Sequence, residues 1–105
     1  MTLHLQTHFV GETAHIQCGE TPHSPVLWYY QTKFIADEHN RFIIISGDYL
    51  NSGDREGRLK LIGSTLVIEN VMESDRGIYT CVDTAAAGHE EKVKYQLRLD
   101  IDGKE

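Results

Sequence analysis

Two cysteines, Cys18 and Cys81, are the residues with the most definite chemistry in this chain of 105 residues. They stand 63 positions apart, and a disulfide bond across that interval would stabilise the fold by about 4 kcal/mol through loop closure. A distant pair of cysteines can equally be two buried free thiols, above all in a reducing compartment. The spacing alone leaves both states open.

Six histidines raise the question of a bound metal. His4 and His8 would share one face of an extended strand, but four residues at about 3.3 Å each separate them by roughly 13 Å. At that distance the two cannot bind one zinc ion unaided, and no His-x-x-x-His pair sits on a predicted helix. The other histidines are His15, His23, His39 and His89. We predict no metal site at any of them.

A polar loop offers a second metal hypothesis. Its oxygen-bearing side chains, which could coordinate calcium, are Asp48, Asn51, Asp54 and Glu56. Their spacing does not match an EF-hand loop, so we interpret the segment as a solvated turn, with calcium as the alternative. We predict that the chain binds no cofactor.

The residue types that catalysis needs are present, but the patterns are not. The chain has no Gly-x-Ser-x-Gly nucleophile elbow and no ordered Ser-His-Asp signature. Cysteines in a disulfide would be inert as nucleophiles. Gly47, Gly53 and Gly57 are too widely spaced for a phosphate loop and precede no helix. We predict that the protein is not an enzyme.

The charge of the chain narrows the choice of partners. A formal net charge of −6 and an isoelectric point near 5.4 argue against nucleic acid and anionic membranes, because both need clustered Lys and Arg. The longest apolar run, residues 42–45, is far shorter than the roughly 20 residues of a spanning helix. Residues 1–6 lack the features of a signal peptide. We interpret residues 1–105 as a single domain with a core over 10–101, cut from a larger chain.

Short strand-like segments dominate the sequence, and no window keeps a helical period. Residues 58–62 and 64–68 flank Gly63, which predicts a tight hairpin. Residues 93–101 alternate cleanly, with Val93, Tyr95 and the following odd-numbered side chains directed inward. Other strands are predicted at 14–18, 26–31, 34–35, 42–45 and 77–82. About seven or eight short strands with regular turn signals predict an antiparallel sandwich.

Four spaced elements make residues 10–101 resemble an immunoglobulin superfamily domain. They are Cys18, Trp28, the apolar run 66–68, and the Asp-x-Gly-x-Tyr-x-Cys motif formed by Asp75, Gly77, Tyr79 and Cys81. The resemblance implies an all-β fold, a two-sheet antiparallel Greek-key β-sandwich with one disulfide between the sheets, Cys18 to Cys81. It also implies that Trp28 packs on this disulfide and that Tyr79 forms a tyrosine corner.

The same resemblance implies an ion pair. Similar domains pair a basic residue with the aspartate of this motif, here Asp75. Arg58, which precedes the predicted hairpin, stands at the matching place, and Arg41 or Arg55 are the alternatives.

The subset within the superfamily is predicted less narrowly. The long interval between the cysteines leaves room for an extra hairpin, and the sequence of residues 28–31 is similar to a variable-type strand whose Tyr29 and Gln31 positions face a partner sheet. Residues 91–95 contain no Gly-x-Gly bulge, which counts against an antibody or T-cell-receptor variable domain. We therefore expect an intermediate-type or variable-like domain.

The resemblance implies a non-catalytic protein-recognition module of a cell-surface or secreted adhesion, receptor or signalling protein, and an extracellular location. We expect the partner to be a protein ligand or a second copy of the domain, with no nucleic acid and no direct membrane insertion. The candidate binding face comprises Tyr29, Gln31, Phe34 and Thr80. Alternatively, loops 22–25 and 84–90 bind the partner and Tyr29 only covers the sheet edge. The rival interpretation is a structural domain of a giant cytoplasmic muscle or cytoskeletal protein.

Overall fold

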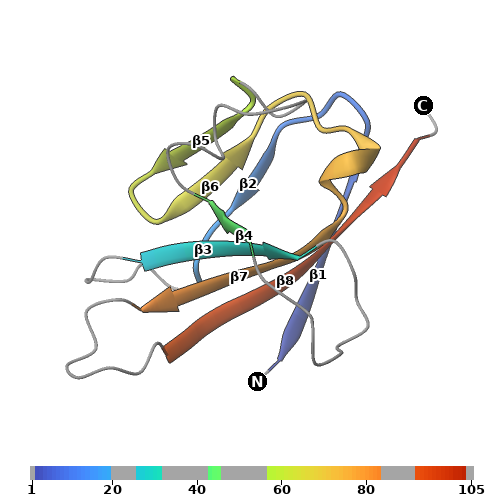
Figure 1. Ribbon diagram of the computed structural model, residues 1–105. Helices are drawn as coiled ribbons and strands as arrows, with labels where there is room; N and C mark the ends of the chain where they lie inside the picture. The colour runs from blue at the N-terminus through green and yellow to red at the C-terminus, as the bar shows by residue number, and fades with distance from the viewer. Residues whose placement is uncertain (1, 20–25, 32–42, 46–56, 84–91, 104–105) are drawn as a thin grey trace.

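The computed structural model describes residues 2–19, 26–31, 43–45, 57–83 and 92–103, which form two β-sheets in separate layers (Figure 1). A 3₁₀ turn, Glu73–Asp75, precedes β7. The strands are β1 (Leu3–Phe9), β2 (Ala14–Ile16), β3 (Val26–Gln31), β4 (Ile43–Ile45), β5 (Leu59–Ile62), β6 (Thr65–Ile68), β7 (Gly77–Asp83) and β8 (Lys92–Asp102). The predicted two-sheet sandwich is confirmed.

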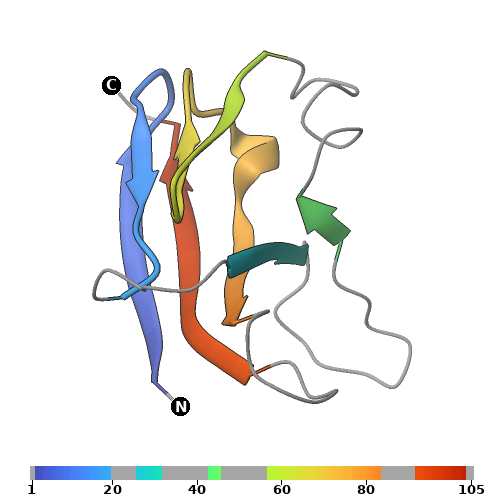
Figure 2. The ribbon, with the colours of Figure 1, turned by 90° about the vertical axis from the view of Figure 1, so that its left-hand side faces the viewer.

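The larger sheet has five strands in the order β1-β8-β7-β3-β4. Its centre is the antiparallel pairing of β3 with β7, which sets Trp28 opposite Cys81. β4 also pairs with β3, and Figure 2 shows β1 and β4 at opposite edges of the sheet. Residues 34–35, predicted as a strand, lie outside the described residues.

One pair of strands differs from the predicted antiparallel arrangement. β1 runs parallel to β8, from Leu3 opposite Gln96 to Phe9 opposite Asp102. Parallel neighbours need a long crossover connection, and here almost the whole domain lies between the two strands. Pairing therefore begins before residue 10, where the predicted core started.

The smaller sheet has the antiparallel order β2-β6-β5. The hairpin predicted around Gly63 is confirmed, because Ile62 pairs with Thr65 and Gly63 has a φ of 62°. A positive φ costs a glycine nothing, and tight hairpins need it. β2 is shorter than predicted and ends at Ile16, two residues before Cys18.

The hydrophobic core lies between the two sheets. Alternate residues of each strand point into it, as the pleat of a strand requires. The buried core residues are Ala14, Ile16, Cys18, Trp28, Tyr30, Leu59, Leu66, Ile68, Val71, Tyr79, Cys81, Leu97, Leu99 and Ile101. Both sheets contribute, so burial of these side chains holds the layers together.

A bulge in β8 overturns one predicted inward position. Cys81 pairs with Tyr95 but Val82 pairs with Val93, so Lys94 is an extra residue in the ladder. The slip of one residue moves Val93 to the opposite face, where 40% of it is exposed. β8 thus contains a bulge although residues 91–95 include no Gly-x-Gly sequence.

No helix in the described part of the chain is long and apolar enough to cross a membrane.

Candidate recognition surface and the framework behind it

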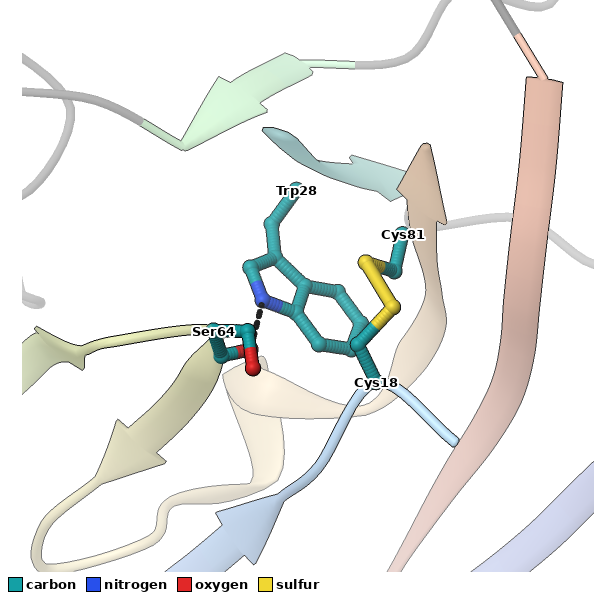
Figure 3. The surroundings of a disulfide bond; sticks show 4 residues. All are labelled: Cys18, Trp28, Ser64 and Cys81. Carbon is teal, nitrogen blue, oxygen red and sulfur yellow. Dashed lines mark hydrogen bonds between the residues drawn. A yellow bond between two sulfur atoms is a disulfide. The ribbon is translucent and has the colours of Figure 1, made fainter. Parts of the chain in front are cut away.

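The two cysteines form a disulfide bond between the sheets. Cys18 follows β2 of the smaller sheet, Cys81 lies in β7 of the larger one, and their Cα atoms are 6.0 Å apart. Figure 3 shows the Trp28 indole beside the sulfur atoms, and its Nε1–H donates a hydrogen bond to the Ser64 carbonyl at 3.0 Å. Trp28 is 1% exposed, so its one polar atom is satisfied within the fold.

Two tyrosines fix the turn that leads into β7. The buried Tyr79 hydroxyl donates to the Asp75 carbonyl at 2.6 Å, which is the geometry expected of a tyrosine corner. The Tyr30 hydroxyl from β3 lies 2.7 Å from the Arg76 carbonyl and 3.1 Å from the Ser74 carbonyl. The two rings contact each other, with centroids 4.8 Å apart. Both strands are thereby tied to the same turn.

An ion pair links this turn to the smaller sheet. Arg58 Nη1 and Nη2 lie 2.8 and 3.1 Å from the two carboxylate oxygens of Asp75, whose side chain is fully buried. The Met72 N–H also donates to this carboxylate, at 2.8 Å. Charge-assisted bidentate bonds of this kind compensate a buried carboxylate for lost hydration. The alternatives to Arg58, Arg41 and Arg55, lie outside the described residues.

The glycine of the Asp-x-Gly-x-Tyr-x-Cys motif permits a close approach of strands. A Cβ atom at Gly77 would lie 2.5 Å from the Gln31 carbonyl oxygen and 2.7 Å from the Tyr30 ring. Contacts that short do not occur between a side chain and backbone, so any other residue would push β3 away from β7. Gly77 is therefore required by packing.

This framework presents the outer face of the five-stranded sheet, the side turned away from the smaller sheet. Because side chains alternate, residues next to the inward Trp28 and Tyr79 point outward. One row across the sheet joins Tyr29 to Thr80 on β7 and Gln96 on β8. Gln96 Nε2 donates to the Thr80 hydroxyl at 3.2 Å. We call this surface the outer face.

Two of the four predicted binding residues are placed on this face but are covered. Gln31 is 8% exposed and Thr80 is 3% exposed, so each presents little surface of its own, and their contact with a partner stays a prediction. Thr80 is a short side chain on a central strand, between the longer Tyr29 and Gln96 of its neighbours. Tyr29 itself is half-buried, and Phe34 lies outside the described residues.

The sequence reasoning missed the part of the outer face that β1 supplies. Leu3 is 47% exposed and Leu5 is 66% exposed, and they lie opposite Gln96 and Arg98 of β8. The alternation of apolar and polar residues over residues 3–6 was a signal that could have revealed this strand. The resemblance to the immunoglobulin pattern covers residues 10–101 and so does not extend to this strand.

Two histidines of β1 contact neighbouring side chains. His4 stacks on Tyr95 with ring centroids 4.4 Å apart, and His8 Nδ1 lies 3.4 Å from the Glu12 carboxylate. Within the described ranges, no three His, Cys, Asp or Glu side chains are grouped so that they could hold a metal ion. The loops 22–25 and 84–90, the predicted polar loop from Asp48, and His23, His39 and His89 lie outside those ranges.

Comparison with known proteins places the chain in a family. Its sequence matches the family described as Immunoglobulin V-set domain over residues 6–100. None of the curated proteins compared with it gives a significant match.

Solved structures share the fold at low sequence identity. An extracellular fragment of novel immune-type receptor 11 from Ictalurus punctatus, including its stalk region, superposes with a TM-score of 0.66 at 20% identity, covering 100% of this chain and 89% of that one. An extracellular fragment of novel immune-type receptor 10 superposes with a TM-score of 0.64 at 18% identity, covering 95% of this chain and 96% of that one. The four N-terminal immunoglobulin domains of Dscam1 isoform 8.4 give a TM-score of 0.63 at 20% identity. The match covers 98% of this chain and 23% of that one. Of the two subsets predicted, the variable type is the one found, and the chain belongs to the immunoglobulin V-set family.

Proposed function

We propose that this domain is a non-catalytic recognition module of a cell-surface or secreted receptor, adhesion or signalling protein, and that it binds a protein partner with the outer face. The observation that carries the proposal is the position of Tyr29, half-buried on β3 and in register with Ile44 of β4 and Thr80 of β7. A tyrosine held by its neighbours loses little entropy when a partner covers it. It also offers both an apolar ring and a hydroxyl.

The surroundings of Tyr29 have the mixed chemistry of protein interfaces. Across the sheet, the exposed leucines Leu3 and Leu5 adjoin Gln96 and the exposed residue Arg98. Tyrosine and arginine are enriched at protein interfaces. The face can therefore bind another protein surface reversibly while the disulfide-linked sandwich behind it stays rigid.

The same residues do not support a reaction. Among the described residues of the outer face, none pairs a nucleophile with a general base in the way that acyl or phosphoryl transfer needs. We therefore assign the domain binding without chemistry.

The disulfide supports an extracellular location. Such bonds persist in oxidising compartments and are rare in the cytosol. Two of the similar structures are described as extracellular fragments of receptors. The rival assignment, a structural domain of a giant cytoplasmic protein, predicts free thiols at Cys18 and Cys81 instead.

The oxidation state in the native source separates these two assignments. The protein is extracted with an alkylating reagent present and its mass is measured before and after reduction. We expect no alkylated cysteine before reduction and alkylation of both Cys18 and Cys81 after it. Alkylation of both cysteines without reduction would reject the extracellular assignment.

Binding by the outer face is tested with tetramers of the biotinylated domain applied to intact cells. Tyr29→Ala should reduce cell staining at least about tenfold, the loss expected when one central aromatic anchor is removed. His15→Ala is the matched control, because His15 is exposed on the smaller sheet and pairs with Val67 there. Both variants should melt within a few degrees of the parent. Equal staining by both variants would refute the role of the outer face.

A further inference from the structure

β1 forms an open edge of the five-stranded sheet (Figure 2). Proteins usually protect such edges by keeping them short or by placing lysine, proline or a charge on them. The edge strands β2 and β4 have three residues each, and β5 has four with Lys60 among them. β1 has seven residues, Leu-His-Leu-Gln-Thr-His-Phe, with no lysine, arginine, proline or acidic residue. It is the longest edge strand in the described part of the chain and has none of these protections.

Part of the β1 backbone faces this edge, where none of the described strands pairs with it. The Val10 N–H donates to the Asp102 carbonyl at 3.1 Å, so even-numbered residues turn their backbone groups toward β8 and odd-numbered ones turn theirs away. The Phe9 groups are used in the following turn, because its N–H donates to the Glu12 carboxylate at 2.6 Å and its carbonyl accepts from the Glu12 N–H. The three remaining odd-numbered residues are Leu3, Leu5 and Thr7.

Three odd-numbered side chains of β1 are apolar and exposed. Leu3, Leu5 and Phe9 are 47%, 66% and 49% exposed. Taking roughly 200 Å² for a fully exposed side chain of this size, they present on the order of 300 Å² of apolar surface along the strand. A patch of that size on a monomer is often a site of interaction.

We propose that two copies of this domain associate through β1, antiparallel and centred on Gln6, so that their five-stranded sheets join into one. In this register Leu3 lies opposite Phe9 of the second copy, and Leu5 lies opposite Thr7 of the second copy. The Leu5 and Thr7 backbones then exchange about four hydrogen bonds across the two-fold axis. The inference does not rest on the proposed function, because it concerns the sheet edge. It leaves Tyr29 and Gln96 of the outer face available and places Leu3 and Leu5 against the second copy.

The pattern of β1 favours a second copy over an unrelated strand. The sequence is nearly symmetric about Gln6. Leu5 and Thr7 flank Gln6, a histidine follows outward on each side, and an apolar residue stands at each end. Self-pairing therefore covers every exposed apolar side chain of the strand. It places no lysine, arginine or carboxylate opposite a group of the same charge. Even if wholly covered, two copies of the strip bury far less than the roughly 1,600 Å² of a standard interface, so the dimer is weak and concentration-dependent.

The test measures association and its location in the same protein. Sedimentation equilibrium from about 10 µM to about 1 mM gives the dimer dissociation constant, Kd, over the range expected of a weak interface. Leu5→Lys should raise Kd about tenfold or more by placing a charge on the edge. Ile62→Lys is the matched control, since Ile62 is 63% exposed on the edge strand β5, and it should change Kd less than about twofold. Each substitution changes the formal net charge from −6 to −5, so the two variants are matched in charge.

Thr7→Pro separates backbone pairing from side-chain contact, because it removes an N–H directed at the open edge and none directed at β8. Amide hydrogen exchange gives the location: the N–H groups of Leu3, Leu5 and Thr7 should exchange more slowly at 1 mM than at 10 µM, roughly in proportion to the dimer fraction. A monomer throughout the range would overturn the proposal. Equal weakening by the two lysine variants, or unchanged exchange at these three amides in a dimer, would do the same.

Discussion

Replacing Arg58 by methionine removes the counterion of a buried carboxylate and keeps most of the side chain's apolar stem. The Asp75 side chain is fully buried and Arg58 is 12% exposed. After the substitution, the Met72 N–H still donates to this carboxylate. The change therefore tests whether the ion pair between Arg58 and Asp75 stabilises the fold, as its buried bidentate geometry indicates.

The expected cost follows from the burial of the pair. Breaking a buried ion pair by removing one partner typically costs about 3–5 kcal/mol, because the other charge stays desolvated. Arg58 also donates to the Asn70 carbonyl at 3.1 Å, but water can replace that bond near the surface. We expect Arg58→Met to lower the free energy of unfolding by about 3 kcal/mol or more. This is a large fraction of the roughly 5–15 kcal/mol that stabilises a domain.

Urea unfolding of the oxidised protein measures this free energy. The control is Lys60→Met, because Lys60 and Glu69 form an ion pair at 2.6 Å whose side chains are 57% and 43% exposed. That substitution should cost less than about 1 kcal/mol, as exposed pairs do. Added salt should weaken the exposed pair and leave the buried one nearly unchanged. An equal loss of unfolding free energy in the two variants would show that burial of Asp75 does not strengthen the contribution of its ion pair, and this would refute the reasoning.

Two further substitutions test the packing around β7. Gly77→Ala should lower the free energy of unfolding by about 2 kcal/mol or more, because the alanine Cβ would meet the Gln31 carbonyl oxygen at 2.5 Å. A melting temperature equal to that of the parent would show that β3 can shift away from β7 without loss of stability. Tyr79→Phe should cost about 1–2 kcal/mol in urea unfolding, since it removes the donor to the buried Asp75 carbonyl. A value near zero would mean that water satisfies this carbonyl.

The framework was predictable because its residues are bound to one another at characteristic spacings. A cysteine, a tryptophan and an Asp-x-Gly-x-Tyr-x-Cys motif occur in this order where the chain must bridge two sheets and close a tyrosine corner. The ion pair of Arg58 with Asp75 was likewise expected from the resemblance.

The surface was harder to predict, because alternation assigns a side chain to a face but not its exposure. Thr80 is on the predicted face, yet its longer neighbours Tyr29 and Gln96 leave it almost no accessible surface. Val93 is exposed because one extra residue in β8 reverses the alternation, and nothing in the local sequence marks that bulge. The parallel pairing of β1 depends on which distant strand its backbone meets, and a local pattern does not contain that information.

Photo-crosslinking from defined positions of the domain tests the central claim, recognition through the outer face, most directly. Two tetramers carry a benzophenone amino acid, one at Tyr29 on the outer face and the other at His15 on the smaller sheet, and both are irradiated on cells that bind the parent domain. We expect the probe at Tyr29 to form a covalent adduct with a cell-surface protein and the probe at His15 to form none. An adduct from the His15 position alone would contradict the account, because the partner would then lie against the opposite side of the sandwich.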